Sequence, residues 1–531
     1  MAISGLVLLI GCANLANLFM AKASARRREF AVRLAIGAGQ GRLLRQLTTE
    51  TLLLFGCGAC CGLGLAFLGS RLTADALAIG RTPFLLDSHL NASVLAFTAG
   101  ITLLTGLIFG VAPFLVAVRS DPYPALKSSG ARASDSRGRM QLRQLLVAVQ
   151  VALSIILLFG AGLFVRTFTN LDRLELGFRP EHVLTLGVSQ VGPSYSEAQL
   201  DLVWSHVLER ARAISGVQSA GLAWLTPLSG RDREVVIAVP GSPAGNLKDQ
   251  IIGENTVSDG YFETLGIPVI SGREFTPADR TGAPQVAILN ESAVKAYFRG
   301  RNPVGMRLEL PRPTGTQSYE IVGVVRDTKH LSLRADAPRF IYLSSRQPRR
   351  PQLRLTLAAR TRTDPNKLAA LLAREVRSAG PDILVSEVTT LRKQVDAALL
   401  QERLLSALSG FFSVLALLLS AAGLYGLLAH LVEQRTNEIG IRIALGADAA
   451  AVVWMILRRS LWLVAAGIAV GIPAAVIAAR PLASLLYGLE TTDGFTACTG
   501  VFVLTTAAML ATYIPARRAA RIDPNTALRW E

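Results

Sequence analysis

Five histidines and five cysteines are the residues of this chain best suited to metal binding or nucleophilic chemistry. The histidines are scattered, and none belongs to an H-E-x-x-H pair of the kind that binds zinc on a helix. Cys57 and Cys60 form a C-x-x-C, but a zinc site of that type needs a second ligand pair, and the surrounding residues are mainly Leu and Gly. We therefore expect no catalytic residue, no metal site and no cofactor. The histidines are His89, His182, His206, His330 and His430.

The sequence also lacks the motif of a phosphate-binding loop. No G-x-x-x-x-G-K-[ST] loop occurs in the chain, so ATP cannot be cradled in the usual way. Glu197, His206 and Glu209 share one helical region, where a solvated helix face explains them better than an enzyme site. Any ATPase activity is expected only from another chain.

Two short charged segments repeat within the chain. Glu29-F-A-V-Arg33-L-A-I-Gly37-A matches Glu438-I-G-I-Arg442-I-A-L-Gly446-A, 409 positions later. Glu and Arg four residues apart support a helix, and the following Gly can end it in a left-handed conformation. We expect amphipathic helices at about 23–38 and 433–447, lying along the inner membrane face. Each either anchors the chain at the interface or docks a cytoplasmic partner, and the duplication favours docking.

The repeat continues beyond these helices. At the same offset Gly58 matches Gly467, Gly62 matches Gly471, and Arg71 matches Arg480. The tails also correspond, because an Asp-Pro pair follows Pro113 and Pro515 at equal spacing. The chain therefore contains a duplicated module rather than a chance similarity.

Apolar runs predict the class of the fold. Crossing a bilayer takes about 20 mostly apolar residues. Seven segments qualify, so we expect a polytopic α-helical membrane protein of about seven spans. They are Ala2–Ala21, Thr48–Leu68, Ala92–Val118, Leu145–Phe164, Leu404–Leu431, Leu457–Ala479 and Phe495–Ile514.

The formal net charge of +17 admits three explanations: nucleic-acid binding, binding to an anionic surface, or the positive-inside bias of membrane loops. The short loops on one side of the membrane carry 21 basic and eight acidic residues. The short loops on the other side carry only three basic residues, Arg71, Arg81 and Arg480. The charge is thus mainly a topology signal, and we expect no nucleic-acid partner. The basic loops and the C-terminus are expected in the cytoplasm and the N-terminus outside; the absence of a basic segment before the first apolar run argues against a signal peptide.

Residues 166–402 have the polarity of a water-soluble domain and are expected outside the membrane. Strands are predicted at 183–188, 285–289, 319–325 and 353–357, and helices at Glu197–Ile214, Glu291–Phe298 and Asn366–Ser378. Ser196 is positioned to cap the first helix. We expect an α+β domain of two lobes, hinged near Asp249 and Ser345.

These motifs together resemble a known family. R-x-x-E-I-G-I-R-x-A-L-G-A, from Arg435 to Ala447, looks like the signature of FtsX/MacB-type ABC transporter permeases. The outer segment from Val257 to Phe275, V-S-D-G-Y-F-E-T-L-G-I-P-V-I-S-G-R-E-F, resembles the MacB-type periplasmic core domain, as do Asn290–Val294 and Asn302–Arg307. The duplicated layout is similar to the duplicated orphan permeases of acidobacteria and their relatives.

The resemblance implies a site and partners. In such permeases the cytoplasmic amphipathic helix contacts a nucleotide-binding subunit, so an ABC ATPase is the expected partner, with a periplasmic adaptor and membrane lipids as further ones. It also implies a bacterial inner-membrane location. The residues carried over by position are Glu438, Ile439, Arg442, Leu445 and Gly446 in the second copy, and Glu29, Arg33 and Gly37 in the first.

The resemblance also implies four spans per module, with the outer domain between the first and second. The first module here lacks its opening span and outer domain, which indicates a truncated gene model or a shortened natural variant. The expected organisation is a first permease module at 1–130, a basic cytoplasmic linker at 131–144, the opening span of the second module at 145–165, the outer domain at 166–402 and the second permease module at 403–531.

Two functions remain open from the sequence. One is a permease that couples ATP hydrolysis by a partner to motion of the outer domain, for efflux or envelope substrate handling. The other is a membrane scaffold or sensor that transports nothing and binds a periplasmic partner.

Overall fold

The computed structural model describes residues 2–25, 40–77, 93, 96–97, 99–101, 104, 132–192, 195–238, 250–312, 315–347, 352–434, 441–442, 445 and 448–521. Two compact units make up the chain. The helical unit comprises Met1–Ala74, Leu85–Asn170 and Glu402–Glu531, and the sheet unit comprises Asp75–Phe84 and Leu171–Gln401.

Long apolar helices form the helical unit. Five contain windows apolar enough to cross a membrane, and Ile3–Asn17 is a shorter apolar helix. They coincide with six of the seven predicted spans, whereas the predicted span Ala92–Val118 lies almost wholly outside the described residues. The elements are α1 (Ala2–Ala25), α3 (Gln40–Leu77), α6 (Arg132–Asp172), α12 (Leu400–Gln434), α14 (Ala449–Ala479), the 3-10 helix η2 (Arg480–Leu485) and α15 (Gly494–Ala519).

α6 and α12, like α3 with its 38 residues, are longer than a bilayer requires. α6 has 41 residues and α12 has 35, so at 1.5 Å per residue they extend about 60 and 50 Å. Residues 132–144, predicted as a basic linker, are the first part of α6. The polar ends of both helices lack Pro, so nothing in their sequences stops the helix where the apolar run ends.

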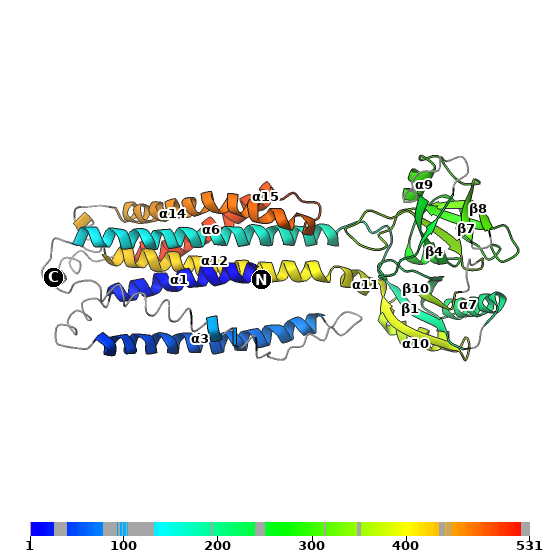
Figure 1. Ribbon diagram of the computed structural model, residues 1–531, viewed down its shortest axis with the longest axis horizontal. Helices are drawn as coiled ribbons and strands as arrows, with labels where there is room; N and C mark the ends of the chain where they lie inside the picture. Colours follow the sequence, from blue (N-terminus) through cyan, green and yellow to red (C-terminus); the bar gives the residue numbers. More distant parts are fainter. Residues whose placement is uncertain are drawn as a thin grey trace. The chain divides into compact units, whose positions relative to one another are not determined.

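A shared apolar core joins α6, α12, α14 and α15, which run side by side in Figure 1. α1 joins this bundle through a smaller cluster around Ile10, Leu157 and Ala416. Lipid tails are as apolar as these side chains, so association depends on close packing more than on burial from water.

Glycines allow the closest approach, between α14 and α6. A Cβ placed on Gly467 would lie 2.6 Å from the Val151 Cβ, and one on Gly471 would lie 3.0 Å from the Ala152 Cα. Both distances are too short for a side chain, so only glycine permits this contact. The G-x-x-x-G spacing places both glycines on one helix face.

The sheet unit is built on one mixed sheet with the strand order β11-β1-β10-β2-β4-β9-β6-β8-β5, to which β3 and β7 add at β4 and β8. The strands are β1 (Val183–Gln190), β2 (Val217–Ala223), β3 (Glu234–Val236), β4 (Ile251–Val257), β5 (Val269–Gly272), β6 (Val286–Asn290), β7 (Arg307–Arg312), β8 (Gly315–Val325), β9 (Phe340–Ser344), β10 (Arg354–Thr361) and β11 (Ile383–Thr390). The helices are α7 (Glu197–Arg212), α8 (Tyr261–Leu265), α9 (Glu291–Tyr297), α10 (Pro365–Arg377) and α11 (Leu391–Ala398).

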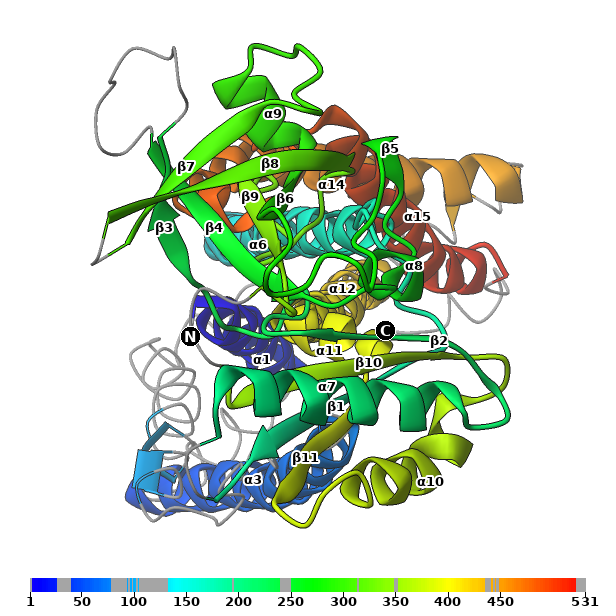
Figure 2. The same ribbon diagram turned by 90° about the vertical axis from the view of Figure 1, so that its right-hand side faces the viewer.

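Two apolar cores lie along this sheet. α7 and α10 cover β1, β10 and β2 in one core (Figure 2), and α9 packs against β6, β8 and β9 in the other. Between them β2 and β4 share a single register pair, Ala223 with Val257. Ser196 caps α7 as predicted, with Gln199 completing a reciprocal capping box.

The chain enters and leaves the sheet at neighbouring strands. α6 leads into β1, and β11 leads through α11 into α12. β1 and β11 are paired antiparallel, with Leu184 opposite Thr390. The Arg392 guanidinium also lies 3.6 Å from the Asp172 carboxylate at the end of α6. α6 and α12 are therefore joined to adjacent strands of one ladder.

Candidate functional site

The predicted docking residues of the second copy lie between α12 and α14, in residues 435–448, which we call the junction segment. Of those named from the sequence, Arg442 and Leu445 are described, whereas Glu438, Ile439, Gly446, Glu29, Arg33 and Gly37 lie outside the described residues. The Leu445 amide donates to the Ile441 carbonyl at 3.0 Å, which is one helical turn. The Arg442 guanidinium lies 3.0 Å from the Met455 sulfur of α14.

The two apolar side chains of the junction segment that the structure describes are exposed. Leu445 is 83% exposed and Ile441 is 47% exposed. Asp448 ends the segment by capping α14, where its side chain accepts from the Ala450 amide. A cation flanked by two exposed aliphatic side chains can bind a surface that is partly apolar and partly acidic.

A line of polar contacts, here the polar seam, joins α6 to α12 inside the bundle. Ser420 and Ser413 donate to the carbonyls of Gln150 and Leu157, at 3.3 and 2.8 Å. Ser154 lies between them, 2.7 Å from the Ser420 hydroxyl. The two serines of α12 are seven residues apart, and so are their acceptors on α6. Hydrogen bonds of this kind between membrane helices average about 0.6 kcal/mol each, so the seam sets the register of the two helices more than their stability.

α1 adds to the polar seam from the other copy of the repeat. The Gln150 amide donates to the Ile10 carbonyl at 3.2 Å, and the Asn17 amide donates to the Gly423 carbonyl at 3.4 Å. Asn14 is only 7% exposed and its side chain approaches the same glycine. Three helices thus meet around amide groups within the apolar bundle.

The N-terminal end of α15 is held against α6 by Asp493. Its carboxylate accepts from the Thr496 amide at 2.8 Å, capping α15, and pairs with the Arg166 guanidinium of α6. Burial raises the pKa of Asp493, but hydrogen bonds from Thr496 and the Arg166 charge outweigh it and place the pKa below its ordinary value. Asn170 extends the contact by donating to the Tyr487 carbonyl.

Asp493→Ala is expected to lower the free energy of unfolding by about 1 kcal/mol, because α15 loses its N-cap and Arg166 loses its ion-pair partner. Asp493→Asn keeps a capping oxygen and should cost about half as much. Thermal unfolding of the purified chain in detergent measures both. Equal midpoints for the Ala variant and the original chain would contradict the role assigned to Asp493.

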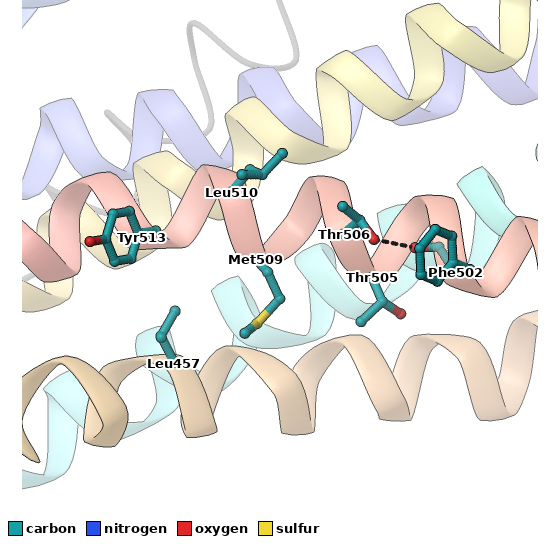
Figure 3. Close-up of a pocket in the computed structure, with 7 residues that line it drawn as sticks. All are labelled: Leu457, Phe502, Thr505, Thr506, Met509, Leu510 and Tyr513. Carbon is teal, nitrogen blue, oxygen red and sulfur yellow. Dashed lines mark hydrogen bonds between the residues drawn. The ribbon is translucent and has the colours of Figure 1, made fainter. Parts of the chain in front are cut away.

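An apolar groove lies between α14 and α15. It encloses about 400 Å³ and is lined by Leu457, Phe502, Thr505, Thr506, Met509, Leu510 and Tyr513 (Figure 3). The Thr506 hydroxyl donates to the Phe502 carbonyl of its own helix at 2.8 Å. This hydroxyl is therefore hydrogen-bonded within α15, and the groove stays mainly apolar. Phe502 and Leu510 are 71% and 66% exposed, so the groove suits an acyl chain of a lipid.

In the sheet unit a smaller polar hollow of about 240 Å³ lies beside β1 and α11. It is lined by Thr185, Trp224, Thr226, Ser229, Arg231, Thr356, Glu387 and Gln394. Within the described part of the chain, no group of three or more His, Cys, Asp and Glu side chains is arranged to hold a metal ion.

The polar seam was missed by sequence reasoning, although a signal for it exists. Ser406, Ser413 and Ser420 recur every seven residues in an apolar helix and all are buried. Asn14 and Asn17 are likewise polar residues in an apolar run. Polar side chains at helical spacing inside a span indicate a helix–helix contact.

Two family models match different parts of the chain. Residues 145–378 match the MacB-like periplasmic core domain, and residues 1–122 and 410–524 match the FtsX-like permease C-terminal family. A macrolide export ATP-binding/permease protein MacB from Mannheimia succiniciproducens is 25% identical over 320 residues, which are 58% of this chain and 47% of that one. A pyoverdine export ATP-binding/permease protein PvdT from Pseudomonas entomophila is 26% identical over 294 residues, which are 52% of this chain and 42% of that one.

The chain spans about half the length of the curated relatives it matches. Among solved structures, the periplasmic region of MacB from Actinobacillus actinomycetemcomitans matches 40% of this chain and 90% of that one, at 15% identity and a TM-score of 0.28.

Proposed function

The chain belongs to the FtsX/MacB-type permeases of ABC transporters, and from this premise we propose that it couples ATP hydrolysis by a separate ATPase to motion of its outer domain. That motion would drive efflux or the handling of an envelope substrate. The protein is a multi-pass membrane protein, and we propose that its junction segment and C-terminus face the cytoplasm of a bacterium and its sheet unit faces the periplasm.

One observation carries this proposal: a single unbroken helix, α12, connects the junction segment to the sheet unit. A helix of 35 residues is stiff over its length, so displacement at one end reaches the other. The exposed Ile441, Arg442 and Leu445 follow its inner end, and α11 and β11 precede its outer end.

The neighbouring strands β1 and β11 supply the point where that motion would act. α6 is followed by β1 after residues 173–182, and α12 follows β11 through α11, so sliding of α12 against α6 would shear the β1–β11 ladder. The ladder already contains a register shift between Thr185 and Gly187, and Glu387 has a φ of 54°. An irregular ladder resists shear less than a regular one.

We propose that a cytoplasmic ABC ATPase docks on the junction segment and that a periplasmic adaptor binds the sheet unit. Within the second copy the docking surface is Glu438, Ile439, Arg442, Leu445 and Gly446. The first copy would contribute Glu29, Arg33 and Gly37. The exposed Ile441 and Leu445 side chains provide apolar contact area, and Arg442 provides the charge that orients the partner.

The test is a double substitution, Arg442→Glu with Leu445→Asp, in the full chain. Binding to a purified candidate ATPase is expected to weaken about tenfold, which corresponds to about 1.4 kcal/mol. Stimulation of ATP hydrolysis by the permease should fall with it. The measurements are the dissociation constant in detergent and the ATPase rate in proteoliposomes.

Arg517→Glu is the matched control, because Arg517 is an exposed arginine at the same end of the bundle but on α15. It should leave binding unchanged. If the double variant bound the ATPase as tightly as the original chain, the junction segment would not be the docking surface.

A further inference from the structure

The polar hollow of the sheet unit gathers side chains from five segments of the fold. Thr185 is on β1, Thr356 on β10, Glu387 on β11 and Gln394 on α11, and the other four lining residues lie in the segment that follows β2. Its volume of about 240 Å³ is several times that of one water molecule and smaller than a site for a drug-sized molecule. The size of the hollow therefore suits a ligand as small as an amino acid.

Gln394 brings a buried hydrogen-bond acceptor to this hollow. Its side chain is 8% exposed, and its Nε2 donates to the Thr185 hydroxyl at 3.3 Å. Its Oε1 accepts from no group in the described part of the chain, and the buried Ser229 hydroxyl likewise has no partner there. A buried polar group without a partner costs about 1–3 kcal/mol. A ligand that donates to the Gln394 Oε1 would remove this cost.

Arg231 gives the hollow an excess of positive charge. Its guanidinium is paired with no carboxylate of the described residues, whereas the Glu387 carboxylate lies 3.0 Å from the Arg354 guanidinium. A guanidinium binds a carboxylate or a phosphate through parallel hydrogen bonds. The negative charge of Glu387 in the same hollow repels a phosphate dianion more strongly than a carboxylate. The charges therefore favour a ligand that carries a carboxylate.

Glu387 is brought to the hollow by an irregularity of β11. Between the pairs Thr185–Thr389 and Gly187–Ser386, β11 contains one residue more than β1. Within this stretch Glu387 has a φ of 54°, which residues other than glycine rarely adopt. A bulge of this kind redirects a side chain, and here the redirected carboxylate lines the hollow. This negative charge makes an ammonium group a better donor than a hydroxyl for a ligand bound there.

We propose that the polar hollow binds a free α-amino acid, which carries a carboxylate and an ammonium group on one carbon. Arg231 binds the carboxylate, and the Gln394 Oε1 accepts from the ammonium group. The hydroxyls of Thr185, Ser229 and Thr356 are available as further partners because each can both donate and accept. The site lies within the sheet unit, so it does not depend on an ATPase at the junction segment.

The test is calorimetric titration of the full chain in detergent with each of the common L-amino acids. At least one is expected to bind with a dissociation constant of about 1 mM or below. Arg231→Gln should weaken binding by about tenfold or more, because the carboxylate loses its guanidinium partner. Gln394→Met has a side chain of similar length without the amide oxygen, and should weaken binding to a similar extent. The same ligand without its amino group should bind about equally to the original chain and to Gln394→Met.

Arg326→Gln is the matched control, because Arg326 is an exposed arginine of the sheet unit that does not line the hollow. It should bind the amino acid as the original chain does. Arg231 is half-buried in a loop, so Arg231→Gln should keep the original thermal midpoint even if Gln394→Met does not. The proposal would be overturned if no amino acid bound at about 10 mM, if Arg231→Gln bound as tightly as the original chain, or if inorganic phosphate bound in preference to every amino acid.

Discussion

A chain with leucine at position 471 is expected not to assemble its helical bundle. The first atom of that side chain would overlap the Ile155 Cγ2 and lie 3.0 Å from the Ala152 Cα. Overpacking a core commonly costs about 1–3 kcal/mol, and here backbone as well as side chain must move, so we expect about 3 kcal/mol or more. The measurement is the yield of monodisperse protein from detergent extracts, with the thermal midpoint of what remains.

Gly62→Leu is the comparison that isolates the cause. It makes the same chemical change at the repeat-equivalent position, where no described atom lies within 4 Å. Expression and thermal midpoint of the isolated chain should stay close to those of the original. If Gly471→Leu were tolerated as well as Gly62→Leu, the contact between α6 and α14 would not determine assembly.

Acidification from pH 7 to pH 5 is expected to destabilise the sheet unit through His330. The ring is 2% exposed, packs 4.3 Å from the Phe340 ring, and neither ring nitrogen has a hydrogen-bond partner in the described structure. Burial lowers the pKa of His330 from 6.5 to about 4. In the unfolded chain the ring takes up a proton below about 6.5, whereas in the folded chain it does so only near 4.

Proton uptake by the unfolded chain therefore lowers the free energy of unfolding as the pH falls from about 6.5 toward 4. At pH 5 the free energy of unfolding is lower by about 2 kcal/mol, given this difference between the pKa values of the unfolded and folded chain. Urea unfolding of residues 171–401 at the two pH values measures it. His330→Phe should remove this part of the pH dependence, and His206→Gln, at an exposed position, should keep it. A His330→Phe variant that loses as much stability as the original on acidification would contradict the assignment.

The membrane architecture was predictable because its signal is local. Twenty apolar residues in a row need no knowledge of the fold, and the spans from Leu145, Leu404 and Leu457 fall on α6, α12 and α14. The ends of the helices were not predictable in the same way. α6 begins at Arg132 because helix propensity continues beyond the apolar run, and hydropathy does not report it.

Strands were predicted where side chains alternate or are uniformly apolar, as in β1, β6, β8 and β10. β4 was missed because Ile251–Val257 contains Glu254 and Asn255, both buried. The Asn255 side chain bonds the Leu225 amide and carbonyl across the sheet, at 3.0 and 2.9 Å. A buried polar group that is satisfied only by a distant strand cannot be recognised from local pattern.

The candidate docking residues came from the family resemblance and the internal repeat rather than from their chemistry. Arg442 and Leu445 matter as a pair only if both are exposed, and exposure depends on how α12 and α14 leave the bundle. The role of Asp493 depends in the same way on Arg166, which is 327 residues away along the chain. Sequence spacing carries no information about such pairs.

The contact between Asn14 and Gly423 shows what carrying both modules in one chain permits. They are repeat-equivalent, 409 positions apart, yet they meet: a Cβ on Gly423 would lie 3.2 Å from the Asn14 Oδ1 and 2.6 Å from the Gln150 Oε1. Two identical modules associating as separate chains would have the same residue at both positions, either two amides without room or two glycines without a hydrogen-bonding group. A single chain that carries both modules is free of this constraint, because one copy can keep the amide while the other has no side chain.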